Sequence, residues 1–349
     1  MEAKKNITEK VTINDFILLG EQFKNPTSKF NLELSTVIDF VKQENQWFAN
    51  ESVLKAIAAW AELLDENNLR KWLSNYSYSK TIEPKTVAII MAGNIPLVGF
   101  HDLLCVLISG NKVLVKPSSD DKILLNLVIK TLIEINPNLK RRIEIVDGAL
   151  KNIDAIIATG SNNSARYFDY YFSKYPNIIR KNRNSVAILI GNEGDNDLKN
   201  LGKDIFNYYG LGCRNVSKLY VPLNYNFNLF FEAIFEFGQV INHNKYGNNY
   251  EYNRAVYLMN STPLLDNNFL LLKEDESLSS PIGVLFYEFY SNLDDVKIKL
   301  HENSNKIQCV VCDKNINFTN SVNFGDSQKP GLMDYADGVD VMDFLTKLN

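Results

Sequence analysis

The chain has 349 residues, of which 45% are hydrophobic and 22% charged, and its formal net charge is −4 at pH 7. This length predicts two domains, and a mildly acidic chain without a dominant basic patch argues against nucleic acid as a partner. Its four cysteines form no dense framework, which is typical of proteins from a reducing compartment.

Two further features bear on where the protein resides. Residues 1–10 are polar and charged and contain no apolar signal core. The longest apolar runs, such as residues 87–91, are far too short to cross a bilayer. We therefore expect a cytoplasmic protein without a membrane span.

The first half of the chain alternates between helical and strand patterns. Residues 31–75 show helical periodicity, and residues 86–91 form an apolar run that predicts a buried strand. Pro96 is placed to open a helix, and Gly110 to end it. The other elements expected here are strands at 113–115, 143–146 and 155–158, and helices after Ser118 or Ser119 and from 163 to 175. Such alternation implies right-handed crossovers and a parallel sheet, which is a natural platform for a cofactor.

A second α/β layer is expected in the other half of the chain. It begins with a buried strand at 185–190, followed by a helix that runs to about Tyr208. Further strands are expected at 218–221, 283–289 and 306–312, a helix at 227–240, and a turn and short helix in the tail. The domains predicted are helices and a cofactor-binding domain at 1–183, a catalytic domain at 184–322, and a C-terminal turn and helix at 323–349 that pack back on the body.

Cys213 lies between Gly212 and Arg214, where a helix gives way to a strand. Glycine allows a tight bend that exposes the next side chain, and a neighbouring cation favours the reactive thiolate. The alternative is a small cysteine buried in the core. Local features alone favour this second interpretation.

Three strand ends carry further candidate residues. Asn94 follows the first strand, where its amide can donate to a developing oxyanion, although a helix N-cap or turn role fits the local pattern better. Lys116 ends the next strand, where it either meets a ribose or phosphate or is simply solvated. Gly160 and Ser161 follow a further strand and open a helix, which suits a pyrophosphate or a plain turn with a serine cap.

Cys309 and Cys312 have the spacing of a metal or redox pair but lie in an apolar strand. Residues three apart on a strand point to opposite faces, so the two sulfurs cannot converge on one ion. No second pair completes a site, and we expect no metal centre.

Six short motifs occur in a fixed order from residue 92 onward. They are AGNIP at 92–96, SGNKVLVKPS at 109–118, ATGS at 158–161, FNYYGLGCRN at 206–215, SPIGVL at 280–285, and FG at 324–325 before KPG at 329–331. Together they resemble the aldehyde dehydrogenase superfamily, and within it the acyl-CoA reductase branch of LuxC-like fatty-acyl reductases. Residues 1–80 match only as a generic helical lead-in. The resemblance implies an α/β fold of two domains, one Rossmann-like for the cofactor and one α/β catalytic domain.

The resemblance also implies roles for individual residues. Cys213 matches the nucleophile that forms a thiohemiacetal or thioester, and Asn94 matches the side-chain oxyanion donor that works with the backbone N–H of Cys213. Lys116 matches the lysine at the adenosine ribose, and Ser161 the serine at the pyrophosphate. Pro281 lies in the segment that usually closes over the nicotinamide ribose. The cofactor-binding set expected from the resemblance also includes Ser118, Ser119 and Gly160.

Departures from the superfamily pattern refine the expected reaction. Arg180 stands where hydrolytic members carry a glutamate base, and an acyl-enzyme needs a base to activate water for hydrolysis. Its loss favours reduction of an activated acyl group to an aldehyde. Ser119 stands where NAD-preferring members carry a glutamate, and its loss makes room for a 2′-phosphate. NADPH is therefore the cofactor expected, with NADH as the alternative.

Two segments differ from the superfamily in ways that concern cofactor binding and the oligomeric state. Residues 278–280 lack the glutamate usually found before Pro281, which weakens the expected hold on the nicotinamide ribose. Residues 76–85 are short for the hairpin with which many members bridge subunits. We therefore do not assume a tetramer, and expect a homodimer or a partner subunit that transfers or activates acyl groups.

The function expected is NAD(P)H-dependent reduction of an acyl-CoA or acyl-protein thioester to an aldehyde, through a covalent acyl group on Cys213. One alternative is an acyl-phosphate reductase, with a basic pocket supplied by Arg180, Lys181, Arg183 and Arg214. Another is an acyl-transfer or acyl-carrying subunit with weak or lost cofactor binding.

Overall fold

The computed structural model describes residues 12–76, 83–316 and 318–348. Its contacts divide the chain into a first unit, Met1–Lys181 with Gly331–Asn349, and a second unit, Asn182–Pro330. The domain boundaries predicted after residues 183 and 322 stay predictions. The expectation for residues 1–10, and most of that for 76–85, falls outside the described residues.

The first unit is built on a parallel sheet of five strands in the order β3-β2-β1-β4-β5. The strands are β1 (Thr86–Ile90), β2 (Lys112–Lys116), β3 (Ile143–Ile145), β4 (Ala155–Thr159) and β5 (Asn177–Arg180). The chain moves outward from β1 to β3 and then returns to the other side of β1 with β4. This order creates a topological switch point between β1 and β4, and ligands of open α/β sheets bind at such points.

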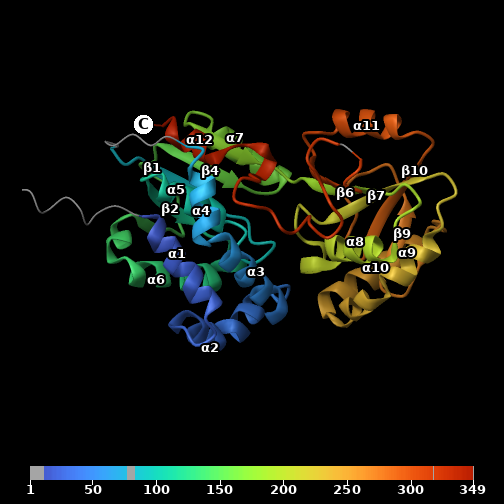
Figure 1. Ribbon diagram of the computed structural model, residues 1–349, viewed down its shortest axis with the longest axis horizontal. Helices are drawn as coiled ribbons and strands as arrows, with labels where there is room; N and C mark the ends of the chain where they lie inside the picture. The colour runs from blue at the N-terminus through green and yellow to red at the C-terminus, as the bar shows by residue number, and fades with distance from the viewer. Residues whose placement is uncertain (1–11, 77–82, 317, 349) are drawn as a thin grey trace, which may run out of the picture. The chain divides into compact units, whose positions relative to one another are not determined.

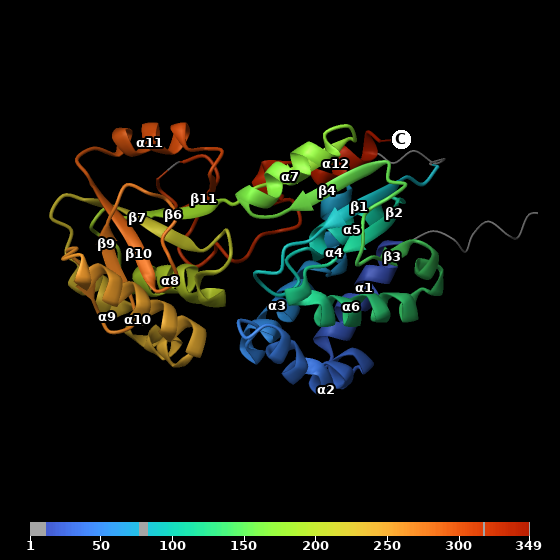
Figure 2. The ribbon, with the colours of Figure 1, turned by 180° about the vertical axis from the view of Figure 1, so that it is seen from behind.

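Helices cover both faces of the first sheet (Figures 1 and 2). Alternate residues of a strand point to opposite faces: Val87 and Ile89 belong to the large core, whereas Ala88 packs with Phe168 of α7. The helices that supply the large core are α1 (Ile13–Lys24), α2 (Lys29–Glu44), α3 (Asn50–Leu63), α4 (Glu66–Leu73), α5 (Phe100–Ile108), α6 (Lys122–Ile135) and α12 (Val341–Thr346). The other face carries α7 (Asn162–Phe172).

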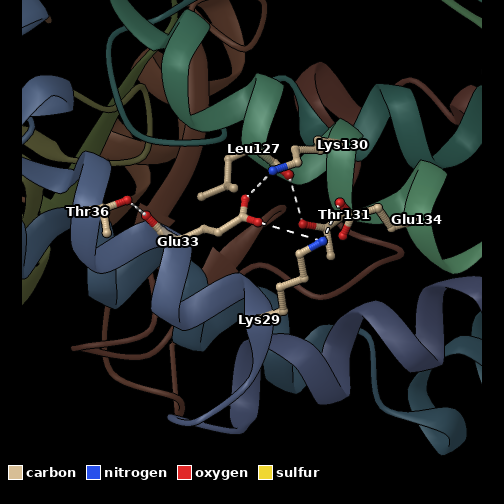
Figure 3. A network of polar contacts seen from close by, with 7 residues as sticks. All are labelled: Lys29, Glu33, Thr36, Leu127, Lys130, Thr131 and Glu134. Atoms are coloured by element: carbon tan, nitrogen blue, oxygen red, sulfur yellow. Dashed lines mark hydrogen bonds and ion pairs between the residues drawn. The ribbon is translucent and has the colours of Figure 1, made fainter.

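Ion pairs connect α2 with α6 on the surface of the first unit (Figure 3). Lys29 Nζ lies 2.7 Å from Glu134 Oε1, and Lys130 Nζ lies 2.6 Å from Glu33 Oε2. These side chains are between 29% and 63% exposed, and pairs that solvent reaches contribute little to stability. Buried Phe30 therefore contributes more to the attachment of α2 than the ion pairs do.

The second unit contains a sheet of seven strands in the order β12-β11-β6-β7-β10-β9-β8. The strands are β6 (Asn184–Ile188), β7 (Val216–Pro222), β8 (Leu265–Asp266), β9 (Leu271–Glu274), β10 (Val284–Tyr290), β11 (Ile307–Val311) and β12 (Ser321–Val322). Neighbouring strands are parallel except for the β8–β9 pair. One face packs against α11 (Leu293–Glu302) and the other against α8 (Asp195–Phe206), α9 (Phe227–Ala233) and α10 (Asn244–Met259) (Figures 1 and 2).

Several predicted helices differ from those of the structure. The helix expected between Pro96 and Gly110 is present as α5, but its predicted start is wrong, because residues 94–99 form bends and turns and α5 begins only at Phe100. The helix expected at 227–240 ends at Ala233 and is followed by a 3₁₀ segment, Phe235–Asn242. The prediction overlooked α10, because its asparagine- and tyrosine-rich sequence has little apolar periodicity. Ser118 does cap the 3₁₀ turn that leads into α6, as expected.

No helix in the described part of the chain combines the length and the apolar character needed to cross a bilayer.

Candidate active site

The first sheet gathers three predicted site segments at one edge. Asn94 follows β1, Lys116 ends β2, and Ser161 follows β4. β1 pairs with both other strands in parallel, so that Ile90 lies opposite Lys116 on one side and Ala158 on the other. All three segments therefore lie at the carboxyl-terminal edge, with Asn94 and Ser161 flanking the switch point.

The loop after β1 is packed tightly against the loop after β2. A Cβ on Gly93 would lie 2.4 Å from Ser118 Oγ, so this position requires glycine. Leu97 adopts a left-handed φ of 57°, and its N–H donates to Asp121 Oδ2 at 2.8 Å. Asn94 is exposed on this fixed loop. It is not a helix N-cap, since Gly99 occupies that position for α5.

Asp121 is a buried carboxyl group beneath the Asn94 loop. Burial raises the pKa of Asp121 to about 8, and the negative charge of Asp120 adds to the rise. The hydrogen bond from the Leu97 N–H acts in the opposite direction and lowers the pKa. Its Oδ1 atom has no hydrogen-bond partner in the described part of the chain. Asp121 is therefore largely protonated at neutral pH in the folded state.

Replacing Asp121 with asparagine should make stability less dependent on pH. Its folded pKa lies above the ordinary 3.8, so between about pH 4 and pH 8 the folded state holds a proton that the unfolded state has released. The free energy of unfolding of the wild type therefore falls as pH rises through this window. Asp121→Asn is neutral throughout and keeps an acceptor for Leu97.

We compare the free energies of unfolding of Asp121→Asn and the wild type. We expect the difference in favour of the variant to grow by more than about 1.4 kcal/mol, the equivalent of one pKa unit, between pH 5 and pH 9. Chemical unfolding at several pH values measures this difference. The matched control is Glu144→Gln, because Glu144 is exposed on β3 of the same unit. An Asp121→Asn advantage that is the same at both pH values would contradict the prediction.

The predicted cofactor residues have local partners at the same edge. Lys116 Nζ donates to the Gly148 carbonyl at 3.1 Å, and Ser119 is exposed. Ser161 caps α7 by accepting from the N–H of Ser164 at 3.2 Å. A Cβ on Gly160 would lie 2.9 Å from both Phe168 and Ser164, so glycine lets α7 approach the strand.

These contacts indicate how this edge can hold an anionic ligand. The hydroxyl of Ser161 is already used as the cap, which leaves the first backbone amides of α7 as donors at a helix N-terminus. Lys116, at the end of β2 and separated from β4 by β1, supplies a positive charge at the same edge. The edge can therefore accept an anionic ligand at the first amides of α7.

Cys213 is exposed, whereas Cys105, Cys309 and Cys312 are buried; all four cysteines lie in the described residues. The alternative of a buried core cysteine is therefore wrong for Cys213. The residue comes just before β7, at the amino-terminal edge of the second sheet. Its sulfur is thus accessible to an electrophile.

The chain before Cys213 follows an unusual backbone path. Tyr208, Tyr209 and Gly210 have φ values of 52°, 57° and 78°, three successive residues in the left-handed region. For residues other than glycine this conformation costs about 1–2 kcal/mol each, and it persists only where surrounding contacts impose it.

Asn215 and Ser185 supply such contacts. Asn215 Nδ2 donates to the carbonyls of Asp204 and Asn207 at 3.0 and 2.8 Å, and its Oδ1 accepts from the Gly212 N–H at 2.8 Å. Ser185 Oγ donates to the Cys213 carbonyl at 3.0 Å. The backbone on both sides of the Cys213 side chain is therefore fixed by buried polar groups.

The segment with Pro281 lies beside the same loop. It precedes β10, which is parallel to β7, so both segments enter the sheet at one edge. A Cβ on Gly210 would lie 3.8 Å from the Ile282 side chain, and Asn253 Nδ2 donates to the Ile282 carbonyl at 3.1 Å. The second unit thus brings the Pro281 and Cys213 segments together, and Pro281 itself is exposed.

A third segment, the turn at residues 324–328, is bound to the end of α8. Asp204 accepts from the N–H groups of Gly325 and Ser327 at 2.6 and 3.0 Å, and Arg214 Nε donates to the Ser327 carbonyl. Burial raises the pKa of Asp204 to about 6, while these N–H donors oppose the rise.

Arg180 is buried in the first unit as part of an ion pair. Its guanidinium donates to both carboxylate oxygens of Asp102 on α5, at 2.6 and 3.0 Å. Burial alone would lower the pKa of Arg180, but the Asp102 carboxylate raises it above its ordinary value. Arg180 therefore holds β5 to α5.

The other cations of the expected basic pocket are also bound locally. Lys181 lies 3.4 Å from Asp169, Arg183 donates to the carbonyls of Ser304 and Ile307, and Arg214 to that of Ser327. Each cation has a partner within its own unit. These contacts do not favour an acyl-phosphate site.

Comparison with known families decides which group of proteins the chain belongs to. The model of the family described as "Acyl-CoA reductase (LuxC)" matches residues 26–225, which include Asn94, Lys116, Ser161 and Cys213. The chain belongs to the acyl-CoA reductase (LuxC) family. This membership confirms the resemblance deduced from the ordered motifs.

A curated relative of this LuxC-family chain is a long-chain acyl-protein thioester reductase from Photorhabdus laumondii. The two are 26% identical over 149 residues, and the match covers 38% of this chain and 31% of the relative. The chain thus spans about a third of the length of that relative in the match.

Solved structures of aldehyde dehydrogenases share the fold of the LuxC-family chain. Aldehyde dehydrogenase 21 from Physcomitrella patens has a TM-score of 0.64 at 13% identity, covering 98% of this chain and 85% of its own. An NAD-dependent enzyme from Sinorhizobium meliloti gives 0.62 at 12% identity, with coverages of 88% and 72%. These likenesses confirm the aldehyde-dehydrogenase-like α/β fold.

Proposed function

We propose that this LuxC-family chain reduces an acyl thioester to an aldehyde through a covalent acyl group on Cys213. The observation that carries the proposal is the exposed Cys213 on a backbone held by Asn215 and Ser185. Family membership and the thioester substrate in the name of the Photorhabdus relative support it.

The proposed reaction begins when the Cys213 thiolate attacks the thioester carbonyl carbon. The negative charge that develops on the carbonyl oxygen is stabilised by the Asn94 amide and the backbone N–H of Cys213. The carbon–sulfur bond of the substrate then breaks, and the departing thiolate takes up a proton. Cys213 keeps the acyl group as a thioester.

A nicotinamide cofactor is proposed for the first sheet. Lys116 would meet the adenosine ribose, Ser118 and Ser119 would lie beside it, and Gly160 and Ser161 would place the pyrophosphate at α7. Pro281 would lie over the nicotinamide ribose. When bound in its reduced form, the cofactor supplies a hydride to the acyl carbon. Cys213 then leaves as thiolate and the aldehyde is released.

The cofactor proposed is NADPH, with NADH as the alternative. Ser119 itself is uncharged and leaves space where a glutamate would repel a 2′-phosphate. Both cofactors occur among the structural neighbours: aldehyde dehydrogenase C from Pseudomonas syringae forms a complex with NAD⁺ and octanal, and an Escherichia coli enzyme is NADP-dependent. Tryptophan fluorescence during titration with each cofactor distinguishes the two, and binding of neither would favour an acyl-carrying subunit.

The surroundings of the reaction are part of the proposal. The substrate is an acyl-CoA or an acyl-protein, and the chain works in the cytoplasm as a homodimer or with a partner subunit that transfers or activates acyl groups. The cofactor domain would comprise residues 1–183 and the catalytic domain residues 184–322. Residues 323–349 would pack back on the body.

Mass spectrometry of the protein after incubation with mixed acyl-CoAs, without reductant, tests the function directly. We expect one acyl adduct on the peptide that contains Cys213. It should persist because Arg180 stands where hydrolytic members of the superfamily carry the glutamate that activates water. The mass of the preferred adduct gives the chain length. Adducts confined to other residues, or none with any acyl-CoA or acyl-protein, would refute the proposal.

A further inference from the structure

The Gln328 side chain lies beside the Cys213 loop with its amide nitrogen unused. Gln328 Nε2 is buried and has no hydrogen-bond partner in the described part of the chain. A Cβ on Gly212 would lie 3.5 Å from this Nε2 and 3.6 Å from Oε1. The amide therefore faces the residue that precedes Cys213.

The backbone that carries Gln328 is held in place. Asp204 accepts from two N–H groups of the same turn, those of Gly325 and Ser327. Arg214, directly after Cys213, donates to the Ser327 carbonyl. The turn and the Cys213 loop are thus fixed to each other, and a group on one is preorganised with respect to the other.

The acceptor that lies with this amide beside Gly212 already has a donor. Asn215 Oδ1 would lie 2.9 Å from a Cβ on Gly212, but it accepts the Gly212 N–H. The Cys213 carbonyl accepts from Ser185. A buried donor without a partner costs free energy, and such groups in native proteins call for a functional explanation. The missing acceptor would come from a ligand at Cys213.

We propose that Gln328 is a further substrate-binding residue of the Cys213 site, and that its Nε2–H donates to the carbonyl oxygen of the thioester. The inference rests on the proposed function. The carbonyl oxygen is an acceptor that every acyl thioester brings to the cysteine, whatever its chain length. The hydrogen bond strengthens as charge develops on this oxygen during attack by sulfur, so Gln328 accelerates acylation.

Gln328→Met tests the inference, because methionine has a similar shape and no N–H donor. Two rates are compared: acylation of Cys213 by an acyl-CoA, and its alkylation by iodoacetamide, in which sulfur displaces iodide from carbon without forming an oxyanion. We expect acylation to slow by about 10²-fold, the usual effect of losing one oxyanion donor. Alkylation should stay within about twofold of the wild type, since it reports thiolate reactivity and access.

Two further variants complete the test. Gln328→Glu also lacks the donor and adds a negative charge near the oxyanion, so acylation should slow further than in Gln328→Met. Lys329→Met is the matched control, because Lys329 is exposed on the neighbouring position and its loss should leave both rates unchanged.

The outcomes separate this inference from the proposed function. If Cys213 of the wild type is acylated and Gln328→Met is acylated at the same rate, the inference is overturned while the proposed function stands. An equal fall of acylation and alkylation in both Gln328 variants would also overturn it, because it would indicate a merely structural role. If the wild type itself forms no acyl-Cys213, the proposed function fails and this inference fails with it.

Discussion

Cys213→Ala should slow thioester reduction by at least about 10³-fold, because removing the nucleophile of a covalent mechanism leaves only binding and oxyanion stabilisation. The variant should still fold. Cys213 is exposed, and its contact with Ser185 involves the backbone carbonyl, which alanine retains. The reductase rate and the acyl adduct should therefore disappear together while the melting temperature changes little.

The measurement is aldehyde formation from acyl-CoA with NADPH or NADH, with adduct formation followed in parallel. Cys312→Ala is the matched control. It removes a buried sulfur whose hydrogen bond is to the Ile316 carbonyl, so its activity should remain close to that of the wild type. Wild-type rates in Cys213→Ala would exclude this residue as the nucleophile.

Arg180→Met should destabilise the first unit by about 3–5 kcal/mol, because it leaves the buried Asp102 carboxylate without its cation. Both side chains are only 7% exposed, so water cannot replace the lost hydrogen bonds. Replacing both partners, as in Arg180→Met with Asp102→Leu, should recover much of the loss, since no buried charge remains. Chemical unfolding measures the free energies.

Lys181→Met is the control for this experiment. Lys181 is the next residue, but its side chain is 55% exposed and its ion pair with Asp169 spans 3.4 Å, so the change should be below about 1 kcal/mol. Arg180→Met that is as stable as Lys181→Met would contradict the role assigned to the buried pair.

Local patterns predicted much of the first sheet. Strands buried on both faces read as continuous apolar runs, and the strands expected at 86–91, 113–115 and 155–158 agree closely with β1, β2 and β4. The start predicted for α5 at Pro96 was wrong because tertiary contacts prevailed over local preference. Gly93 packs on Ser118, and Asp121 binds Leu97 in a left-handed conformation.

Overlooking α10 had a different cause. Tyr246, Tyr250 and Asn253 are its buried residues, and they recur at helical spacing. Their polar groups made this face look solvent-exposed in the sequence. In the fold these polar groups find partners, as when the Tyr246 hydroxyl donates to the Phe269 carbonyl, and only the tertiary structure supplies those partners.

The sequence by itself determined the family, the order of the motifs and the type of chemistry to expect around Cys213, because these depend on residue identity and spacing along the chain. Only the tertiary structure decided that Cys213 is exposed, that Arg180 is paired with Asp102, and that Gln328 faces the Cys213 loop. The Arg180–Asp102 pair and the approach of Gln328 to the Cys213 loop join segments separated by many residues. Exposure and hydrogen-bond partners of that kind arise from packing, which local patterns do not record.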